Sequence, residues 1–276
     1  MIRGTTTLIA HFGDPIAPVK APMIYNPYFE SVGIDAVVVP MGVRADDYPG
    51  VMRAVFRFTN IRGALVTMPH KVTTVALLDE CSTTVQVAGS CNAIVRREDG
   101  TLYGEMFDGT GFVRGVERKG FPLVGARCLV VGTGGVGSAI AAALAAARVG
   151  AIALFDTYAD GRDGLAARLR RHYPALEVRT DTRDPAGFDL VVNATPLGMN
   201  PGDPLPVDAS HLSPQTFVGE VVMKQEITPL LRAARGIGCP IQVGTDMLFE
   251  QIPLYLEFFG YGLVTPAELR AVAMLA

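Results

Sequence analysis

The stretch RCLVVGTGGVGSA, residues 127–139, decides the fold. An apolar run that ends at Val131 leads directly into the pattern G-x-G-x-x-G, and small apolar residues follow it. A buried strand, a glycine-rich turn and a helix in that order are typical of a dinucleotide-binding βαβ unit. In such a unit Gly132 forms the tight turn, Gly134 lets the pyrophosphate approach bare backbone, and Gly137 lets helix and strand pack closely. The helix N-terminus then attracts the phosphates through its N–H groups and partial positive charge.

The segments after this turn continue the pattern. We expect a helix over 138–150 and a second strand over 151–156, with later strands over 189–193, 216–222 and 240–244. Strands that alternate with helices predict an α/β domain with a parallel sheet, here of the Rossmann type. The turn residues expected to contact the cofactor are Gly132, Thr133, Gly134, Gly135, Val136 and Gly137.

Asp156 bears on the choice of cofactor. It ends the second predicted strand, where an acidic side chain accepts hydrogen bonds from the ribose hydroxyls of NAD and repels the 2′-phosphate of NADP. An aspartate at a strand end also caps turns. Arg162 and Arg168 offer cations to a 2′-phosphate, although arginines are common on helix surfaces. We therefore favour NAD, with NADP as the alternative.

Strands and helices also alternate before residue 115. The predicted strands cover 7–12, 36–40 and 63–68, and the predicted helices lie around 22–32 and 46–58. Residues 93–96 and 101–104 predict a hairpin. Because the pattern restarts near residue 115, we expect two domains. The substrate domain is 1–115, completed by C-terminal helices within 246–276 (Met247–Phe259 and Pro266–Leu275), and the dinucleotide domain is 116–245.

Composition argues against several classes of partner. The net charge of −3 gives no electrostatic reason to expect nucleic acid or an anionic membrane surface. No apolar run approaches the roughly 18 residues of a membrane span, and the first residues lack the pattern of a secretory signal. The four cysteines show no CxxC pairing, so we expect neither a metal site nor disulfides, and a reducing cytoplasm fits. We expect a monomer or a homodimer.

A dinucleotide fold implies hydride transfer, which needs a group that exchanges the proton of the alcohol. Only four of the 24 basic residues are lysines, so a lysine here is a candidate for chemistry that arginine cannot perform. The segment LVTMPHK (65–71) places Lys71 after a strand, and FDGTGF (107–112) places Asp108 in a glycine-flexed loop. We expect His172 and His211 to lie on the surface and His11, in the first strand, to be structural.

Seven segments, taken in order, resemble the shikimate dehydrogenases and the related quinate dehydrogenases, and they span nearly the whole chain. They are GDPIAPVKAP (13–22), VTMPHK (66–71), GSCNAI (89–94), FDGTGF (107–112), GTGGVGSA (132–139), NATPLGM (193–199) and GTDMLFEQ (244–251). The resemblance implies that the first domain, with the final helices, binds a cyclic polyhydroxy acid. It implies that the second domain binds the nicotinamide cofactor.

The resemblance also implies residue roles. Lys71 transfers a proton to or from the reacting oxygen, and Asp108 holds that oxygen and tunes the lysine. Thr67, Asn92 and Gln251 are hydroxyl binders on the substrate ring. The residues implied to lie beside the cofactor are Asn193, Thr195, Met199 and Gly244. His70 holds a variable position of its motif, and we expect it to be a bystander or to face solvent.

The chain departs from the family pattern in one region. The two serines that grip the substrate carboxylate in the family are Val19 and Ala21 here, on either side of Lys20. The family asparagine before V-T is Leu65, and Phe107 replaces the threonine before the catalytic aspartate. The segment D-x-x-Y of the family reads EVVM here, which places Met223 where the family has tyrosine. The residues expected at the substrate are Val19, Lys20, Ala21, Leu65, Thr67, Asn92, Phe107, Met223 and Gln251.

Apolar side chains do not pair with a carboxylate, and an unpaired buried charge is costly. Either Lys20 supplies the countercharge, or the substrate is a ring alcohol or ketone without an acid group at that position. The favoured function is an NAD(P)-dependent oxidoreductase that acts on a cyclic hydroxy compound. The alternatives are a non-catalytic ligand sensor that kept the fold, and another two-domain NAD(P) enzyme such as a folate dehydrogenase. The Lys71–Asp108 pair argues against the sensor, and the order of the motifs argues against the folate enzyme.

Overall fold

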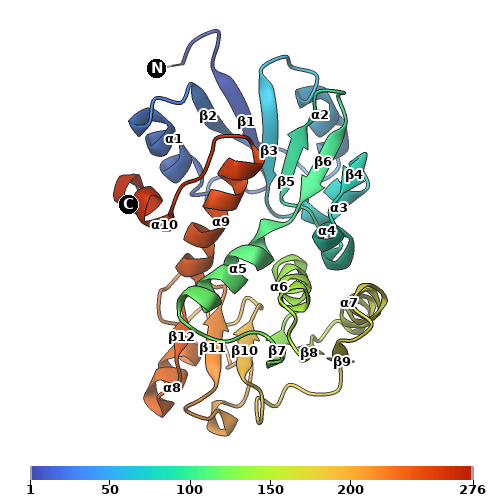
Figure 1. The fold of residues 1–276 in the computed structure, drawn as a ribbon, viewed down its shortest axis with the longest axis vertical. Coiled ribbons are helices and arrows are strands. Elements are labelled where there is room, and N and C mark those ends of the chain that lie inside the picture. Colours follow the sequence, from blue (N-terminus) through green and yellow to red (C-terminus); the bar gives the residue numbers. More distant parts are fainter. Residues whose placement is uncertain (1, 275–276) are drawn as a thin grey trace. The chain divides into compact units, whose positions relative to one another are not determined.

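The computed structural model describes residues 2–274 and divides the chain into two compact units (Figure 1). Unit 1 comprises the residues up to Val85, the segment Ser90–Phe107, and the chain from Ile252 onward. Unit 2 comprises Gln86–Gly89 and Asp108–Gln251. The chain passes from one unit to the other inside the helices α5 (Phe107–Arg118) and α9 (Gly244–Phe258). The sequence pattern placed the first of these boundaries near residue 115.

Unit 1 is built on a mixed six-stranded sheet with the strand order β2-β1-β3-β5-β6-β4. The first three strands are parallel, and β5 and β6 form the antiparallel hairpin that the sequence predicts. The strands are β1 (Thr7–Gly13), β2 (Ala36–Gly42), β3 (Ile61–Val66), β4 (Glu80–Cys81), β5 (Ala93–Arg96) and β6 (Leu102–Glu105). The helices are α1 (Pro22–Ser31), α2 (Tyr48–Val55), α3 (Lys71–Val75), α4 (Thr83–Ala88), which ends in unit 2, and α10 (Pro266–Val272).

The two faces of this sheet have different neighbours. On one face Phe12 of β1 packs edge-on against Tyr48 of α2, with 5.6 Å between ring centroids. On the other face, a Cβ at Gly63 of β3 would lie 2.5 Å from the ring of Phe259, just after α9. Successive side chains of a strand alternate between faces. Leu65 therefore shares the Gly63 face, which is the face toward the C-terminal end of α9.

Unit 2 carries the predicted parallel sheet. Its strand order is β12-β11-β10-β7-β8-β9, and every neighbouring pair is parallel. This is the doubly wound order of dinucleotide-binding folds. The strands are β7 (Arg127–Val131), β8 (Ala151–Phe155), β9 (Glu177–Arg179), β10 (Leu190–Asn193), β11 (Phe217–Glu220) and β12 (Ile241–Gln242). The helical elements wholly within unit 2 are α6 (Gly135–Ala146), α7 (Ala159–His172), η1 (Ala209–His211) and α8 (Pro229–Ile237).

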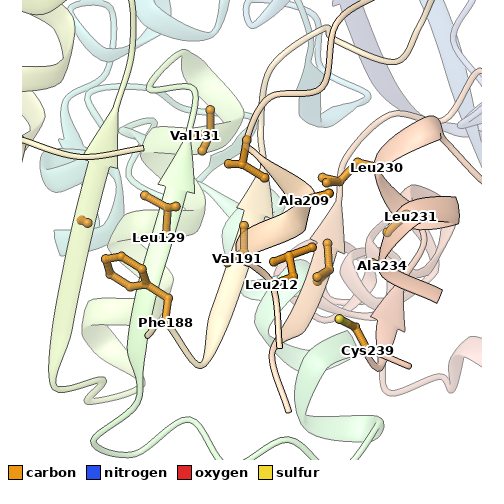
Figure 2. Packing of buried hydrophobic residues seen from close by; sticks show 13 residues of the cluster. Leu129, Val131, Phe188, Val191, Ala209, Leu212, Leu230, Leu231, Ala234 and Cys239 are labelled. Carbon is orange, nitrogen blue, oxygen red and sulfur yellow. The ribbon is translucent and has the colours of Figure 1, made fainter. Parts of the chain in front are cut away.

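Two layers cover the central strands of the unit 2 sheet. On one face Leu129 of β7 and Val191 of β10 pack with Leu231 and Ala234 of α8 in a buried apolar cluster (Figure 2). On the other face, a Cβ at Gly219 of β11 would clash with the ring of Phe112 of α5. No helix within residues 2–274 is long and apolar enough to cross a bilayer.

Several predicted segments differ from the structure in their bounds or their type. The helix expected over 138–150 is α6, which begins at Gly135 and ends at Ala146, because the turn itself provides the first helical residues. The strand expected over 240–244 ends at Gln242, and Gly244 already begins α9. The segment 107–112, predicted as a flexible loop, is the first half of α5. Its glycines serve close packing: a Cβ at Gly109 would clash with the carbonyl oxygen of Ala139 in α6.

Candidate active site

The opening loop of unit 1 is fixed to the end of the sheet. Asp14 donates its backbone N–H to the carbonyl of Met68, and a Cβ at Gly13 would overlap the side chain of Thr67. Thr67 therefore stands against the backbone where β1 ends. The loop continues through the half-buried Val19, the exposed Lys20 and the half-buried Ala21, which precedes α1. Apolar groups thus occupy the positions where the family has its serines.

Lys71 is the first residue of α3, and buried residues hold the turn before it. His70, expected to be a bystander or to face solvent, is only 1 % exposed, so solvent-facing was wrong. Its ring stacks on Tyr48 at 4.1 Å, and its Nε2 hydrogen-bonds the carbonyl of Val43 at 2.8 Å. Burial lowers the pKa of His70, against the raising effects of that carbonyl and of Asp14. A neutral Nε2–H tautomer therefore suits this bond, and the ring anchors the residue next to Lys71.

Asn92 lies immediately before β5 and is 1 % exposed. Its Oδ1 accepts a hydrogen bond from the backbone N–H of Phe107 at 2.9 Å, whereas its buried Nδ2 has no partner. The ring of Phe107 packs edge-on against Tyr255 and Phe258 of α9 at 4.9 and 5.4 Å. The amide is therefore held by its oxygen and keeps a donor for another group, while the neighbouring surface is aromatic.

His11 also belongs to this part of unit 1, although the sequence indicated only a structural role. It is the register partner of Leu65 across β1 and β3, and it is 8 % exposed. Burial, with a smaller contribution from the charge of Lys71, lowers its pKa to about 4. The signal in the sequence that could have drawn attention to it is a polar residue inside an otherwise apolar strand, TLIAHFG.

In unit 2, Asp108 is buried in the first turn of α5. Gln251, expected to bind a substrate hydroxyl, is 9 % exposed and lies on α9. A Cβ at Gly111 would lie 2.7 Å from the Cβ of Gln251, so α5 and α9 pack closely only because residue 111 is glycine. The Oε1 atom of Gln251 is buried without a hydrogen-bond partner. Gln251 therefore keeps an acceptor for another group.

The glycine-rich turn of unit 2 has the features that a pyrophosphate requires. Gly132 has φ +97°, and a Cβ there would lie 2.7 Å from the backbone of Ala194. A Cβ at Gly137 would overlap the carbonyl of Gly132, whereas a Cβ at Gly134 would meet no atom within 4 Å. Gly134 is exposed, and no side chain caps the N-terminus of α6. The first and third glycines are thus needed by the fold, and the second leaves open backbone for a phosphate.

Asp156 follows β8 and is bound into this turn. Its Oδ2 accepts hydrogen bonds from the backbone N and the Oγ1 of Thr133 at 2.6 and 3.0 Å, and its Oδ1 accepts one from the backbone N of Tyr158 at 2.9 Å. Burial raises the pKa of Asp156, but these hydrogen bonds outweigh burial and leave the pKa below its usual value. The carboxylate is therefore ionised at neutral pH and held at the position where a ribose is bound in such folds.

A buried carboxylate organises the loop after β10. Glu220 is fully buried and accepts hydrogen bonds from Asn193 Nδ2 at 3.0 Å and from Thr228 Oγ1 at 2.9 Å, as well as from two backbone N–H groups. Asn193 Oδ1 in turn accepts from Thr195 Oγ1 at 2.7 Å. Burial raises the pKa of Glu220, against these bonds. From the sequence, Glu220 is expected only as a residue of the predicted strand 216–222.

The remaining predicted residues of unit 2 lie at two places. Met199 follows the Asn193–Thr195 loop and Met223 follows β11; both are exposed, at 40 and 42 %. Gly244 begins α9 where a Cβ would clash with the carbonyl of Val222, so glycine is required there for packing. Gly135 and Val136 are the first two residues of α6.

Comparison with known proteins agrees with this geometry. The family model "Shikimate dehydrogenase substrate binding domain" matches residues 12–94. A shikimate dehydrogenase (NADP(+)) of Rubrobacter xylanophilus is 33 % identical over 91 % of this chain and 89 % of that protein. The chain belongs to the shikimate dehydrogenase family. The shikimate dehydrogenase fold, with an N-terminal substrate domain and a Rossmann-type cofactor domain, is confirmed, as is the prediction of an NAD(P)-dependent oxidoreductase.

Two solved structures of similar fold bear different enzyme names. A shikimate 5-dehydrogenase from Listeria monocytogenes, in complex with shikimate and NAD, has a TM-score of 0.91 at 27 % identity and covers 98 % of this chain and 97 % of its own. A ligand-free 5-ketofructose reductase from a Gluconobacter species has a TM-score of 0.87 at 25 % identity and covers 97 % of this chain and 98 % of its own. Members of similar fold thus carry names that refer to substrates with and without a carboxylate.

Proposed function

We propose that the protein is an NAD-dependent oxidoreductase that interconverts a ketone and a secondary alcohol on a small polyhydroxylated compound without a carboxylate. The observation that carries this proposal is the apolar character of the opening loop. Val19 and Ala21 are half-buried, and they stand where family members hold the acid group of the substrate. An anion placed against these side chains would lose hydration without gaining a hydrogen-bond donor.

Lys20 is the one residue of that loop that could oppose this proposal, because it is a cation between the two apolar positions. Its side chain is exposed. An exposed ammonium stays hydrated and contributes little to holding an ion, typically less than about 1 kcal/mol. We therefore assign Lys20 to the solvated rim of the loop.

Lys71 is proposed as the group that exchanges the proton with the reacting oxygen. A nicotinamide dinucleotide held at the glycine-rich turn would supply or accept the hydride. Lysine can act as a proton carrier near neutral pH, whereas arginine does not release its proton. The buried contacts of His70 fix the residue before Lys71, which orients the lysine without contributing charge. Asp108 is proposed to hold the reacting oxygen by accepting a hydrogen bond from the alcohol.

NAD is proposed as the preferred cofactor. Asp156 is ionised and fixed by Thr133 and Tyr158, so a 2′-phosphate in its vicinity would meet a negative charge. The two arginines that could offset this charge are engaged elsewhere. Arg162 pairs with Asp163 at 2.8 Å, and Arg168 donates to the carbonyl of Val87 at 2.7 Å. The curated relative from Rubrobacter bears the name of an NADP(+) enzyme, so this preference distinguishes the present chain from it.

A substrate panel tests this function. Shikimate and quinate, with NAD⁺ or NADP⁺, represent acidic substrates, and 5-ketofructose, with NADH or NADPH, represents a neutral polyhydroxy ketone. We expect turnover of the neutral ketone with NADH, and slow or no turnover of the acids. Efficient turnover of shikimate, or a strong preference for NADPH, would contradict the corresponding part of the proposal. Absence of turnover with every compound, with confirmed cofactor binding, would favour the sensor.

A further inference from the structure

His11 carries a buried ring nitrogen without a partner. Its Nδ1 has essentially no contact with solvent and no hydrogen bond, and the residue is 8 % exposed. Buried polar groups in native proteins are almost always paired, and an unpaired one destabilises the fold. A valine or leucine would fill a β-strand position without this cost. The histidine therefore calls for a group, outside the protein chain, that hydrogen-bonds to it.

The location of His11 identifies the site to which that group belongs. His11 is the register partner of Leu65 in the parallel pair β1–β3, and register partners project to the same face of a sheet. Two residues further along, Gly13 and Thr67 touch on that same face. Thr67 is an expected substrate contact, and Leu65 stands where the family has asparagine. Position 65 of β3 thus lacks the polar side chain of the family, and His11 on the adjacent strand β1 provides one.

Two further observations indicate that His11 lies near Lys71 and does not pack against α2 on the opposite face of the sheet. Phe12, the next residue, points the other way and packs against Tyr48 of α2. The positive charge of Lys71 is close enough to His11 to help to lower its pKa. With a pKa of about 4, the imidazole is neutral at physiological pH and gives no countercharge for a carboxylate. The Nδ1 atom of the ring can form one hydrogen bond, as donor or acceptor according to the tautomer.

We propose that His11 is a substrate-binding residue whose Nδ1 hydrogen-bonds a hydroxyl group of the uncharged polyhydroxylated substrate, in place of the amide that the family has at position 65. The inference rests on the proposed function, because it takes the substrate to be neutral at this point. A hydroxyl suits either tautomer of the ring, since it both donates and accepts. A site built to bind a hydroxyl also discriminates against analogues that lack it.

The test compares His11→Val, His11→Asn and the control His172→Gln in steady-state reduction of 5-ketofructose by NADH. His11→Val should raise KM for 5-ketofructose about fivefold, the effect of one lost hydrogen bond between uncharged groups. The KM for NADH should not change. His11→Asn, which keeps a polar group, should lose less, and His172→Gln should match the wild type. A KM within twofold of the wild type in His11→Val would overturn the inference.

A second experiment separates this inference from the proposed function. In ¹⁵N-histidine-labelled protein, the His11 signal is identified by its absence from the His11→Val spectrum. Addition of 5-ketofructose, in the presence of NAD⁺, should shift that signal and leave the His172 signal in place. If the wild type instead turns over shikimate preferentially, and shikimate shifts the His11 signal, then His11 contacts substrate although the proposed neutral substrate is wrong. If neither compound shifts it, His11 is structural.

Discussion

His11 of β1 and Leu65 of β3 are register partners on one face of the unit 1 sheet, with the imidazole where the strand is otherwise apolar. The structure keeps this imidazole neutral, because burial and the nearby charge of Lys71 lower its pKa from 6.5 to about 4. The buried His11 lowers the stability of the folded protein at acidic pH, and it is proposed to bind the substrate. Each of these effects can be measured.

The cost appears as a pH dependence of unfolding. Between pH 6.5 and about 4 the unfolded chain binds a proton at His11 and the folded chain does not, so the free energy of unfolding falls as the pH falls through this window. The expected loss is about 3 kcal/mol at pH 4 relative to pH 7. His11→Val should remove this contribution. Urea unfolding of both proteins at several pH values measures the difference; identical slopes would show that His11 titrates normally in the folded protein.

Replacement of Lys71 should abolish turnover without loss of the cofactor. Lys71→Ala and Lys71→Arg should both lower kcat by about a thousandfold or more, because neither side chain exchanges a proton with the alcohol. Lys119→Ala, which removes the lysine that pairs with Asp246 in unit 2, is the control and should remain active. NADH binding, followed by fluorescence, should be the same in all four proteins. Activity in Lys71→Arg near that of the wild type would exclude proton transfer by Lys71.

The acidic substrate should be recovered when the missing hydroxyls are returned to the opening loop. The double variant Val19→Ser/Ala21→Ser should raise kcat/KM for shikimate by at least about tenfold, since each hydroxyl adds a charge-assisted hydrogen bond to a carboxylate. The matched control is Val19→Thr/Ala21→Gly, which alters the same positions with a single hydroxyl. No gain in the serine variant would mean that Leu65 and Phe107 have changed the pocket more deeply than the loop alone.

The dinucleotide half of the fold could be predicted well because its signal is local. Gly132, Gly134 and Gly137 are spaced by the geometry of one turn, and the structure requires glycine at 132 and 137 and leaves the backbone at 134 open. The strands before and after this turn could be predicted from their apolar runs. The same logic failed for 107–112, where two glycines indicated a flexible loop. Those glycines serve the contacts of α5 with α6 and α9, and such contacts are not visible in the local sequence.

Burial and pairing across strands were also out of reach of the sequence. Nothing near His70 in the chain indicates that Tyr48 covers its ring, so its burial is visible only in the structure. The pairing of His11 with Leu65 joins residues that are far apart in the chain, so the exchange of an amide for an imidazole is visible only once the register of β1 and β3 is known. Glu220 lies inside the predicted strand 216–222, and its role depends on donors from Asn193 and Thr228, which the local sequence does not show.

Removal of the carboxylate at Asp156 should change the choice of cofactor. In Asp156→Ser the charge that repels a 2′-phosphate is gone, so the ratio of kcat/KM for NADPH over NADH should rise by about tenfold or more. Glu177→Gln, which removes an exposed carboxylate at the start of β9, is the control and should leave the ratio unchanged. An unchanged ratio in Asp156→Ser would remove Asp156 from cofactor selection and leave its bonds to Thr133 as its role.

The proposed function is the reduction of a neutral polyhydroxy ketone, in preference to the carboxylate-bearing ketone formed by oxidation of shikimate. The most direct measurement is the ratio of kcat/KM for two ketones reduced by NADH under the same conditions: 5-ketofructose, and the ketone formed by oxidation of shikimate. We expect a ratio in favour of 5-ketofructose of at least about tenfold, because the carboxylate of the other ketone would be placed against Val19 and Ala21. A ratio in favour of the ketone derived from shikimate would contradict it.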